Sequence, residues 1–319
     1  MDVFLHAASQ MAILFILLIV GMVARRLRLM NDRFDTMLSQ LVMKVALPAM
    51  ILSSVLTNEN LPDAQTIWLL IGCSVVAYTI IILIAELVPR LYRGKSPASK
   101  GTHSFIIAFG NVGFIGFPVL SAIFGPSAVF YGAVYNIPYN IALFSIGEAM
   151  IKRRDSADRP HVGICKRAKA IARTLANPCM AACVLSIVLA LAKVTDVGGI
   201  IGTSCSYLGQ LTVPASMLII GSSLAKMSLK SMVSHLTPYI SALFRLLVVP
   251  VVVFVLFRLF IDDPLVLGVL TVSSAMPVAS VGTMMCLVHG GDVDTMMRGT
   301  FLTTVLSLLT IPLISLLVV

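Results

Sequence analysis

Residues 110–118 read Gly-Asn-Val-Gly-Phe-Ile-Gly-Phe-Pro, which places an amide among helix-breaking residues inside a long apolar segment. In a helix interior, glycine costs about 1 kcal/mol and proline about 3 kcal/mol relative to alanine. We therefore expect the helix to break near Asn111, Gly113 and Gly116, leaving backbone N–H and C=O groups without intrahelical partners. The alternative is a face of small residues that allows close helix packing.

A second stretch of the same character, residues 273–283, has Pro277 near its centre and two hydroxyl side chains, Ser280 and Thr283, after it. The second half of a broken helix presents orphan N–H groups and the positive end of its dipole. Two such breaks that cross inside a membrane form a site for a small anion. Ser280 and Thr283 then either face the ligand or bond back to their own helix.

Three amides are candidates for contact with a substrate. Asn111 is the strongest, since its side chain can bind a carboxylate or cap the second half-helix. Asn136 and Asn140 lie four residues apart and share one helix face. Because amides that face lipid are costly, we expect both to point inward, where they either line a pore or bond to a neighbouring helix.

Lys44 and Arg245 carry charge inside apolar segments, where ionisable side chains are functional candidates by default. Arg245 would either attract a carboxylate into the site or pair structurally with Glu148 or Glu86. The sequence contains no nucleophile–base arrangement and no cluster of metal ligands. We therefore expect neither an enzyme nor a bound cofactor or metal.

The composition indicates which elements must position these residues. Apolar residues make up 58% of the 319-residue chain and charged residues 12%, about half the charged share of a soluble domain. Uncharged stretches of about 20 residues, the length that spans a hydrocarbon core, recur along the chain. We expect an all-α membrane protein with ten transmembrane helices, near residues 3–24, 36–57, 66–89, 102–124, 127–151, 174–194, 204–225, 236–260, 265–288 and 296–318.

The loops between these helices predict the topology. The net charge of +9 comes from Lys and Arg in short loops rather than on one folded face, which argues against a nucleic-acid partner. Nearly all of the basic residues lie in the odd-numbered loops, so the positive-inside rule places these loops in the cytoplasm and both termini outside. We expect a multi-pass protein of the cytoplasmic membrane, with the lipid bilayer as its surroundings.

The chain divides into two halves. A basic linker, residues 152–173, separates a first five-helix repeat, residues 1–151, from a second, residues 174–319. An odd number of spans in each half places the halves in opposite orientations, which predicts an inverted repeat.

Internal similarity supports this division. An offset of 166 residues, which aligns Pro48 with Pro214, also aligns Asn111 with Pro277. Proline inside a span removes a backbone hydrogen bond and bends the helix, and the membrane tolerates this only where neighbouring groups satisfy the freed carbonyl. The matched positions therefore favour breaks in the fourth and ninth helices, where the two halves cross.

Several segments resemble the auxin efflux carrier family, namely residues 25–48, 111–118, 135–140, 275–277 and 306–312. The resemblance covers nearly the whole chain, and the short linker is typical of prokaryotic members, which are often labelled as malonate, malate or other organic-acid carriers. It implies a fold related to sodium/proton antiporters and bile-acid symporters, and a homodimer. It further implies that helices 1, 2, 6 and 7 form a scaffold and that the others form a moving transport domain.

The resemblance and the predicted site together indicate a secondary transporter of a small organic anion, either a mono- or a dicarboxylate, that works by elevator-like alternating access. The coupling ion, H⁺ or Na⁺, stays open. One alternative is a membrane sensor that binds a ligand through the same fold and transports nothing. The other is a sodium-coupled symporter of amphipathic anions. Neither break carries the adjacent pair of acidic residues expected of a sodium/proton antiporter.

Overall fold

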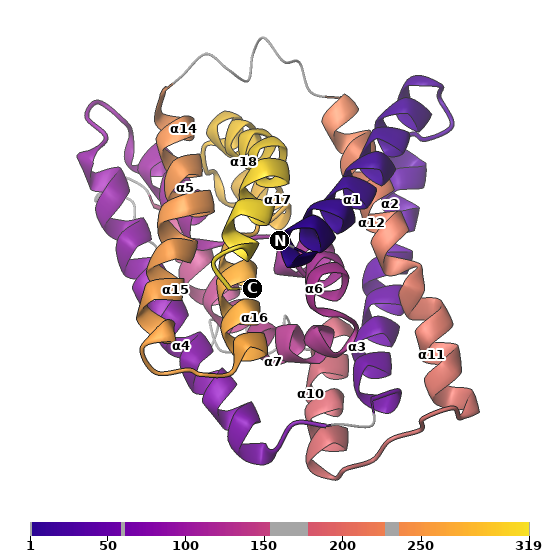
Figure 1. Ribbon diagram of the computed structural model, residues 1–319. Helices are drawn as coiled ribbons and strands as arrows, with labels where there is room; N and C mark the ends of the chain where they lie inside the picture. The colour runs from indigo at the N-terminus through magenta and orange to yellow at the C-terminus, as the bar shows by residue number, and fades with distance from the viewer. Residues whose placement is uncertain (1, 59–60, 154–177, 227–235, 319) are drawn as a thin grey trace.

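The computed structural model describes residues 2–58, 61–153, 178–226 and 236–318. Within these ranges every regular element is a helix, and one isolated β-bridge joins two extended segments. Long apolar runs fold this way because a helix satisfies its own backbone hydrogen bonds, which lipid cannot do. The described structure agrees with the all-α prediction (Figure 1).

The helices follow the predicted apolar segments closely. The first half contains α1 (Asp2–Arg26), α2 (Asp32–Leu41), α3 (Leu47–Leu56), α4 (Ala64–Leu87), α5 (Pro97–Ala108), α6 (Phe117–Phe124), α7 (Ser127–Ala142) and α8 (Glu148–Ile151). The second half contains α10 (Pro178–Leu191), α11 (Ile200–Gln210), α12 (Thr212–Ala225), α14 (Leu236–Leu243), α15 (Val249–Arg258), α16 (Pro264–Ser274), α17 (Val281–His289) and α18 (Val293–Ser315). Short π-helical segments lie next to some of these helices, namely η1 (Val42–Ala46), η3 (Val112–Gly116), η4 (Leu143–Gly147) and η5 (Phe244–Val248). One 3₁₀-helical segment, η2 (Val88–Leu91), follows α4.

Five helices in the described part of the chain are long and apolar enough to cross a membrane. They are Asp32–Leu56, Ala64–Leu91, Ile200–Ala225, Leu236–Arg258 and Val293–Ser315. This supports a multi-pass membrane protein. Most of the basic linker, from residue 154 onward, lies outside the described residues.

Three of the π-helical segments share one position relative to a proline. The segments η1, η3 and η5 begin six residues before Pro48, Pro118 and Pro250, respectively. Proline has no N–H to donate, and its ring collides with the carbonyl four residues earlier. A local widening of the helix moves that carbonyl aside, so these spans continue through their prolines instead of stopping.

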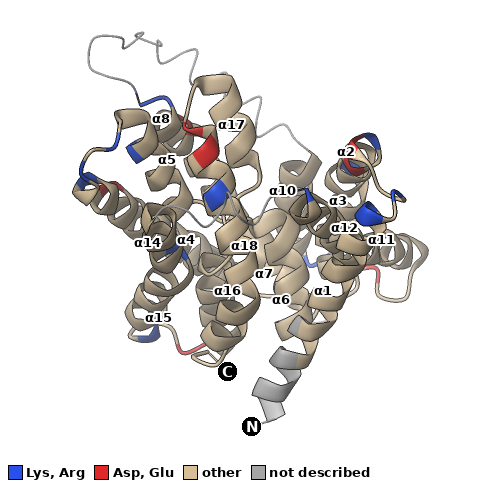
Figure 2. Cartoon of the chain, turned by 90° about the horizontal axis from the view of Figure 1, so that it is seen from above, with Lys and Arg blue, Asp and Glu red and all other residues tan. Residues whose placement is uncertain are grey.

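The helices form two groups with α6 and α7 between them (Figure 1). In one group, α1 packs along α12, and α3 packs against both α10 and α11. In the other, α4 packs against α5 and α7, α15 packs against α16, and α14 packs against α18. Charged residues gather at the helix ends and around the perimeter, whereas the centre of the molecule is almost free of them (Figure 2).

Glycines bring α1 and α12 into close contact. A Cβ at Gly21 would lie 2.4 Å from the Leu218 carbonyl oxygen, and one at Gly221 would lie 2.0 Å from the Leu18 carbonyl oxygen. A side chain at either position would force the two backbones apart. Small residues at helix crossings have this effect in membranes, where close packing drives helix association.

Candidate site at the crossing of two broken helices

The fourth apolar segment breaks at Asn111 as predicted, whereas Gly113 and Gly116 lie inside the helical stretch that follows the break. Helix α5 ends at Ala108, residues 109–111 are irregular, and a helical stretch resumes at Val112 and continues through η3 and α6. The Asn111 side chain caps this second stretch, because its Oδ1 accepts a hydrogen bond of 3.0 Å from the Phe114 N–H. The cap satisfies one orphan donor at the positive end of the helix.

The ninth segment breaks in the same way and meets the first break directly. Helix α16 ends at Ser274, and α17 begins at Val281. The Asn111 N–H donates to the Pro277 carbonyl (2.6 Å), and the Ala279 N–H donates to the Phe109 carbonyl (3.0 Å), in an antiparallel bridge. Each break thus satisfies backbone groups of the other, which buried irregular backbone requires.

Two side chains that were not predicted as part of the site complete the crossing. The Tyr139 hydroxyl on α7 donates to the Gly110 carbonyl at 2.6 Å. The Val278 N–H donates to Oγ1 of Thr303 on α18 at 3.1 Å. Both partners lie on other helices, so no spacing within residues 110–118 or 273–283 could identify them.

Polar groups of both halves meet on the accessible side of the crossing. The Asn111 amide donates through Nδ2 to Oγ of Ser280 at 3.0 Å. Asn111 is buried at 6% exposure, whereas Ser280 is exposed and Thr283, one turn further along α17, is half-buried. The second Nδ2 hydrogen, the Ser280 hydroxyl and those N–H groups at the start of the second half-helices that have no acceptor, such as that of Gly113, are therefore the available donors.

The glycines of the first break do not form a packing face. A Cβ at Gly113 would meet nothing within 4 Å, and one at Gly116 would make only ordinary contacts of 3.4 Å or more. Gly110 is different, because a Cβ there would lie 1.9 Å from Nη2 of Arg245. Close helix packing therefore does not explain Gly113 and Gly116, and Gly113 leaves open space beside the helix end.

Arg245 lies in η5 with 0% exposure, and its side chain contacts the C-terminal end of the first half-helix at each break. It donates to the carbonyls of Met276 (2.8 Å), Ala108 (3.0 Å) and Ile107 (3.2 Å). The expected alternative of a pair with Glu148 or Glu86 is wrong. Glu148 instead forms an ion pair with Lys152, and Glu86 forms one with Arg153.

Comparison with known proteins identifies the family of this chain. The sequence profile of the membrane transport protein family matches residues 6–315. The chain belongs to this family, that of the auxin efflux carriers. It is similar to an uncharacterized transporter of Methanothermobacter thermautotrophicus, with 24% identity over 98% of both chains. It is also similar to an uncharacterized transporter of Methanocaldococcus jannaschii, with 26% identity over 94% of this chain and 95% of the relative.

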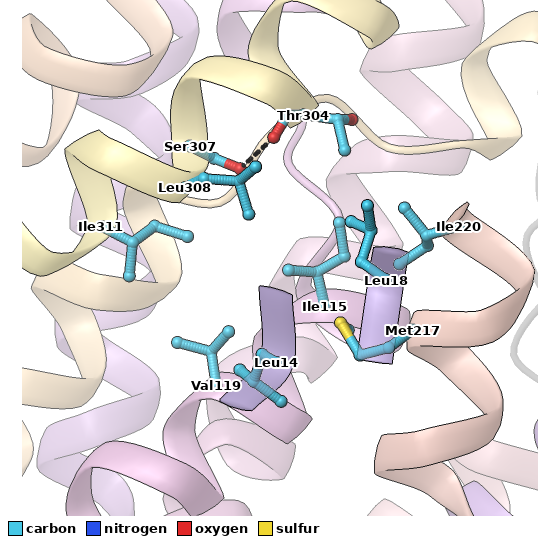
Figure 3. A pocket seen from close by; sticks show the side chains of 10 residues that line it. All are labelled: Leu14, Leu18, Ile115, Val119, Met217, Ile220, Thr304, Ser307, Leu308 and Ile311. Carbon is cyan, nitrogen blue, oxygen red and sulfur yellow. Dashed lines mark hydrogen bonds between the residues drawn. The ribbon is translucent and has the colours of Figure 1, made fainter. Parts of the chain in front are cut away.

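A small apolar cavity lies between the two helix groups of this transporter (Figure 3). Its volume is about 20 Å³, enough for about one water molecule. The lining comes from α1, α12, η3, α6 and α18: Leu14, Leu18, Ile115, Val119, Met217, Ile220, Thr304, Ser307, Leu308 and Ile311. Because Ile115 is only four residues beyond Asn111, the cavity begins one helical turn from the crossing.

The remaining predicted residues lie apart from the crossing. Lys44 is exposed in η1 and makes no hydrogen bond or ion pair with the described residues. Asn136 is buried and interacts with the Cys183 thiol on α10, whereas Asn140 donates to the Asn136 carbonyl of its own helix at 2.7 Å. For Asn136 this geometry favours the interhelical bond over pore lining.

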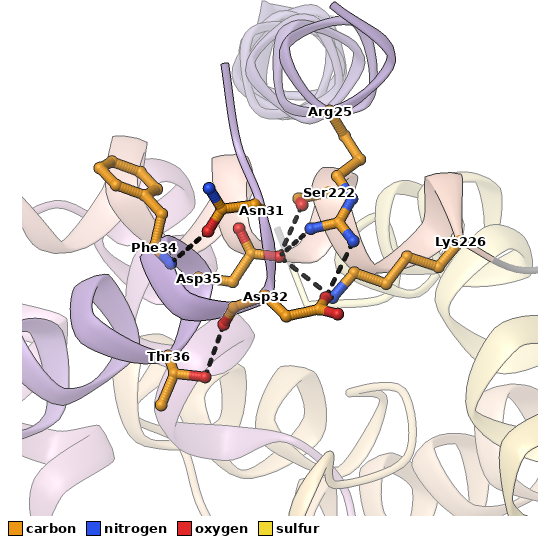
Figure 4. A network of polar contacts seen from close by, with 8 residues as sticks. All are labelled: Arg25, Asn31, Asp32, Phe34, Asp35, Thr36, Ser222 and Lys226. Atoms are coloured by element: carbon orange, nitrogen blue, oxygen red, sulfur yellow. Dashed lines mark hydrogen bonds and ion pairs between the residues drawn. The ribbon is translucent and has the colours of Figure 1, made fainter. Parts of the chain in front are cut away.

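A polar cluster at the ends of α1, α2 and α12, with Asp35 and Ser222 buried inside it, was not predicted (Figure 4). Asp35 accepts a hydrogen bond from Ser222 (2.7 Å) and lies 3.2 Å from Lys226 and 3.5 Å from Arg25. Asp32 pairs with both of these basic residues. Counting only Lys and Arg in the loops hides such a cluster, although the Asp-x-x-Asp spacing at the start of α2 was a visible signal.

Proposed function

We propose that this transporter carries a small organic anion, a mono- or dicarboxylate, across the cytoplasmic membrane. The observation that carries the proposal is the hydrogen bond between Asn111 and Ser280, which joins the positive ends of the second half-helices from the two halves. A carboxylate beside this pair would accept hydrogen bonds from the amide, the hydroxyl and the backbone N–H groups near Gly113. Helix N-termini and charge-assisted bonds both favour an anion.

The electrostatic balance of the crossing supports an anion over a cation. Arg245 bonds to the carbonyls at the ends of the first half-helices, so their negative dipole ends already face a positive charge. Near the positive ends, no acidic side chain in the described part of the chain forms a hydrogen bond or ion pair with Asn111 or Ser280. A bound carboxylate would supply the missing negative charge.

The packing supports ten spans in an inverted repeat as part of this proposal. In such a repeat, α1 corresponds to α10 and α12 to α3, so the contact of α1 with α12 predicts a contact of α10 with α3. In the same way, the contact of α4 with α5 predicts a contact of α15 with α16. Both contacts are present. In this arrangement the basic odd-numbered loops are cytoplasmic and both termini lie outside.

Alternating access would follow from motion of one helix group past the other. The group of α1, α3, α10 and α12 would form the scaffold, and the crossing would travel with the other group. Two features support this division: the polar cluster of Figure 4 ties together helices of the scaffold group alone, and the cavity of Figure 3 lies where the two groups meet. The scaffold would also provide the surface for the homodimer that the family resemblance implies.

Flux measurements with purified protein in proteoliposomes test the proposal. A screen of mono- and dicarboxylates should find at least one that raises the thermal midpoint and is taken up. Asn111→Ala should weaken both effects, whereas Gln210→Ala, which removes an exposed amide at the end of α11, should leave both unchanged.

Two results would count against the proposal. Binding of a carboxylate without any flux would favour the ligand-sensor alternative. Flux that is equally strong in Asn111→Ala would place the anion site elsewhere in the molecule.

A further inference from the structure

Arg245 occupies an unusual position for a charged side chain. It is fully buried at the centre of its span and has no acidic partner among the described residues. Its three hydrogen bonds all go to main-chain carbonyls, two at the end of α5 and one just after the end of α16. One side chain of the eighth segment thus joins the first halves of both broken helices.

Helix dipoles explain how this charge is tolerated. The C-terminal end of a helix carries roughly −0.5 of an elementary charge. Two such ends, α5 and α16, supply about −1 in total and so balance the guanidinium without a carboxylate. Conversely, without the guanidinium, the two helix ends and their carbonyls would be a negative pocket deep in the protein.

A pocket of this kind has a recognised chemistry. In transporters with broken helices, carbonyls at unwound backbone and half-helix C-termini coordinate coupling cations such as Na⁺. Hard cations prefer oxygen ligands of this type. In this protein, the Arg245 guanidinium lies among carbonyls of this kind, where a coupling cation would otherwise bind.

We propose that Arg245 is a built-in cation that takes the place of a coupling sodium ion, so that transport proceeds without sodium. This inference rests on the proposed anion transport. Close packing around the guanidinium supports the idea that Arg245 stays among these carbonyls, because a Cβ at Gly110 would lie 1.9 Å from Nη2 and 2.9 Å from the Met276 carbonyl oxygen. The backbone at Gly110 closes directly on the guanidinium.

A tyrosine hydroxyl fixes the backbone next to the guanidinium. Tyr139 donates to the Gly110 carbonyl at 2.6 Å, beside the guanidinium. The ring of Tyr78 lies 5.2 Å from that of Tyr135 and 5.5 Å from that of Tyr139, so three aromatic residues of α4 and α7 pack together on this side of the crossing. Arg245 is therefore a positioning residue for the crossing, separate from the donors at Asn111 and Ser280.

The first test measures carboxylate uptake by wild-type proteoliposomes with sodium fully replaced by choline. The expected result is an unchanged initial rate and a thermal midpoint that does not respond to sodium. Uptake that requires sodium would overturn the inference and leave anion transport intact. The absence of carboxylate uptake under every ionic condition would instead refute the proposed function.

The second test removes the built-in charge. Arg245→Gln should gain a thermal midpoint that rises with sodium but not with choline, because the carbonyls then face an empty space. Arg245→Lys retains a positive charge and should remain insensitive to sodium. If Arg245→Gln and Arg245→Lys respond to sodium alike, or if purified Arg245→Gln shows no response, the guanidinium does not occupy a cation position.

Discussion

Replacement of Asn111 by aspartate separates the capping role of this residue from recognition of an anion. An aspartate can accept the same hydrogen bond from the Phe114 N–H that the amide oxygen now accepts at 3.0 Å. Asn and Asp are nearly equivalent as N-caps, so Asn111→Asp should leave the helix start intact. The variant loses the Nδ2 donor and places a negative charge where the substrate carboxylate is proposed to bind.

The size of the effect follows from the geometry of the site. Two like unit charges about 4 Å apart repel by about 4 kcal/mol at an effective dielectric constant of 20. Since 1.4 kcal/mol corresponds to a factor of ten, affinity for the anion should fall on the order of 1,000-fold. Asn111→Ala introduces no charge: it removes the helix cap, the bond to Ser280 and one hydrogen bond to the anion, and the loss of this last bond, worth about 1.5–3 kcal/mol, should lower affinity about 10- to 100-fold.

Calorimetric binding and counterflow in proteoliposomes would measure both losses. Gln210→Glu adds the same charge at an exposed amide at the end of α11 and serves as the matched control. An Asn111→Asp protein that folds normally and binds the carboxylate as tightly as the wild type would refute the reasoning. So would equal losses in Asn111→Asp and Gln210→Glu, because the effect would then not be local.

Three further substitutions test separate parts of the structure. Ser280→Asp should block uptake of the anion, because it places a negative charge at the start of α17 where the anion is proposed to bind; undiminished uptake would contradict the proposed site. Gly110→Ala should lower the thermal midpoint sharply, because the new Cβ collides with Arg245; an unchanged midpoint would show that the guanidinium can move. Asp35→Asn keeps the size of the side chain but removes its charge beside Lys226, and should lower the unfolding free energy by about 1–3 kcal/mol, between the values for exposed and buried ion pairs; chemical denaturation would measure this loss.

The two breaks were predictable because their cause is local. Glycine, proline and amide residues disfavour a helix through their own backbone and side-chain properties, whatever surrounds them. The helix breaks after Ala108 although Val112, the residue after Asn111, is not itself a helix breaker. The Asn111 N–H, which the break frees, bonds to the Pro277 carbonyl of the second break at 2.6 Å.

The partners of Arg245 could not be predicted, because they are main-chain carbonyls of distant segments. Sequence reasoning pairs a buried cation with an acid, and Glu86 and Glu148 were the acids available within the spans. Helix ends carry partial charges whose position depends on where each helix ends and in which direction it runs. The types of the residues do not reveal either. The same limit applies to Tyr139, whose hydroxyl meets the crossing only after α7 has packed beside it.

The crossing is asymmetric in a way that bears on recognition. The helix after the first break is capped by the Asn111 side chain, whereas Ser280 does not cap α17 and instead accepts a hydrogen bond from Asn111. The α17 end therefore retains more unpaired N–H groups, and an anion should settle closer to it. Asn111 would then contact the anion from the opposite half while it keeps its own helix capped. One amide would in this way link ligand binding to the relative position of the two halves.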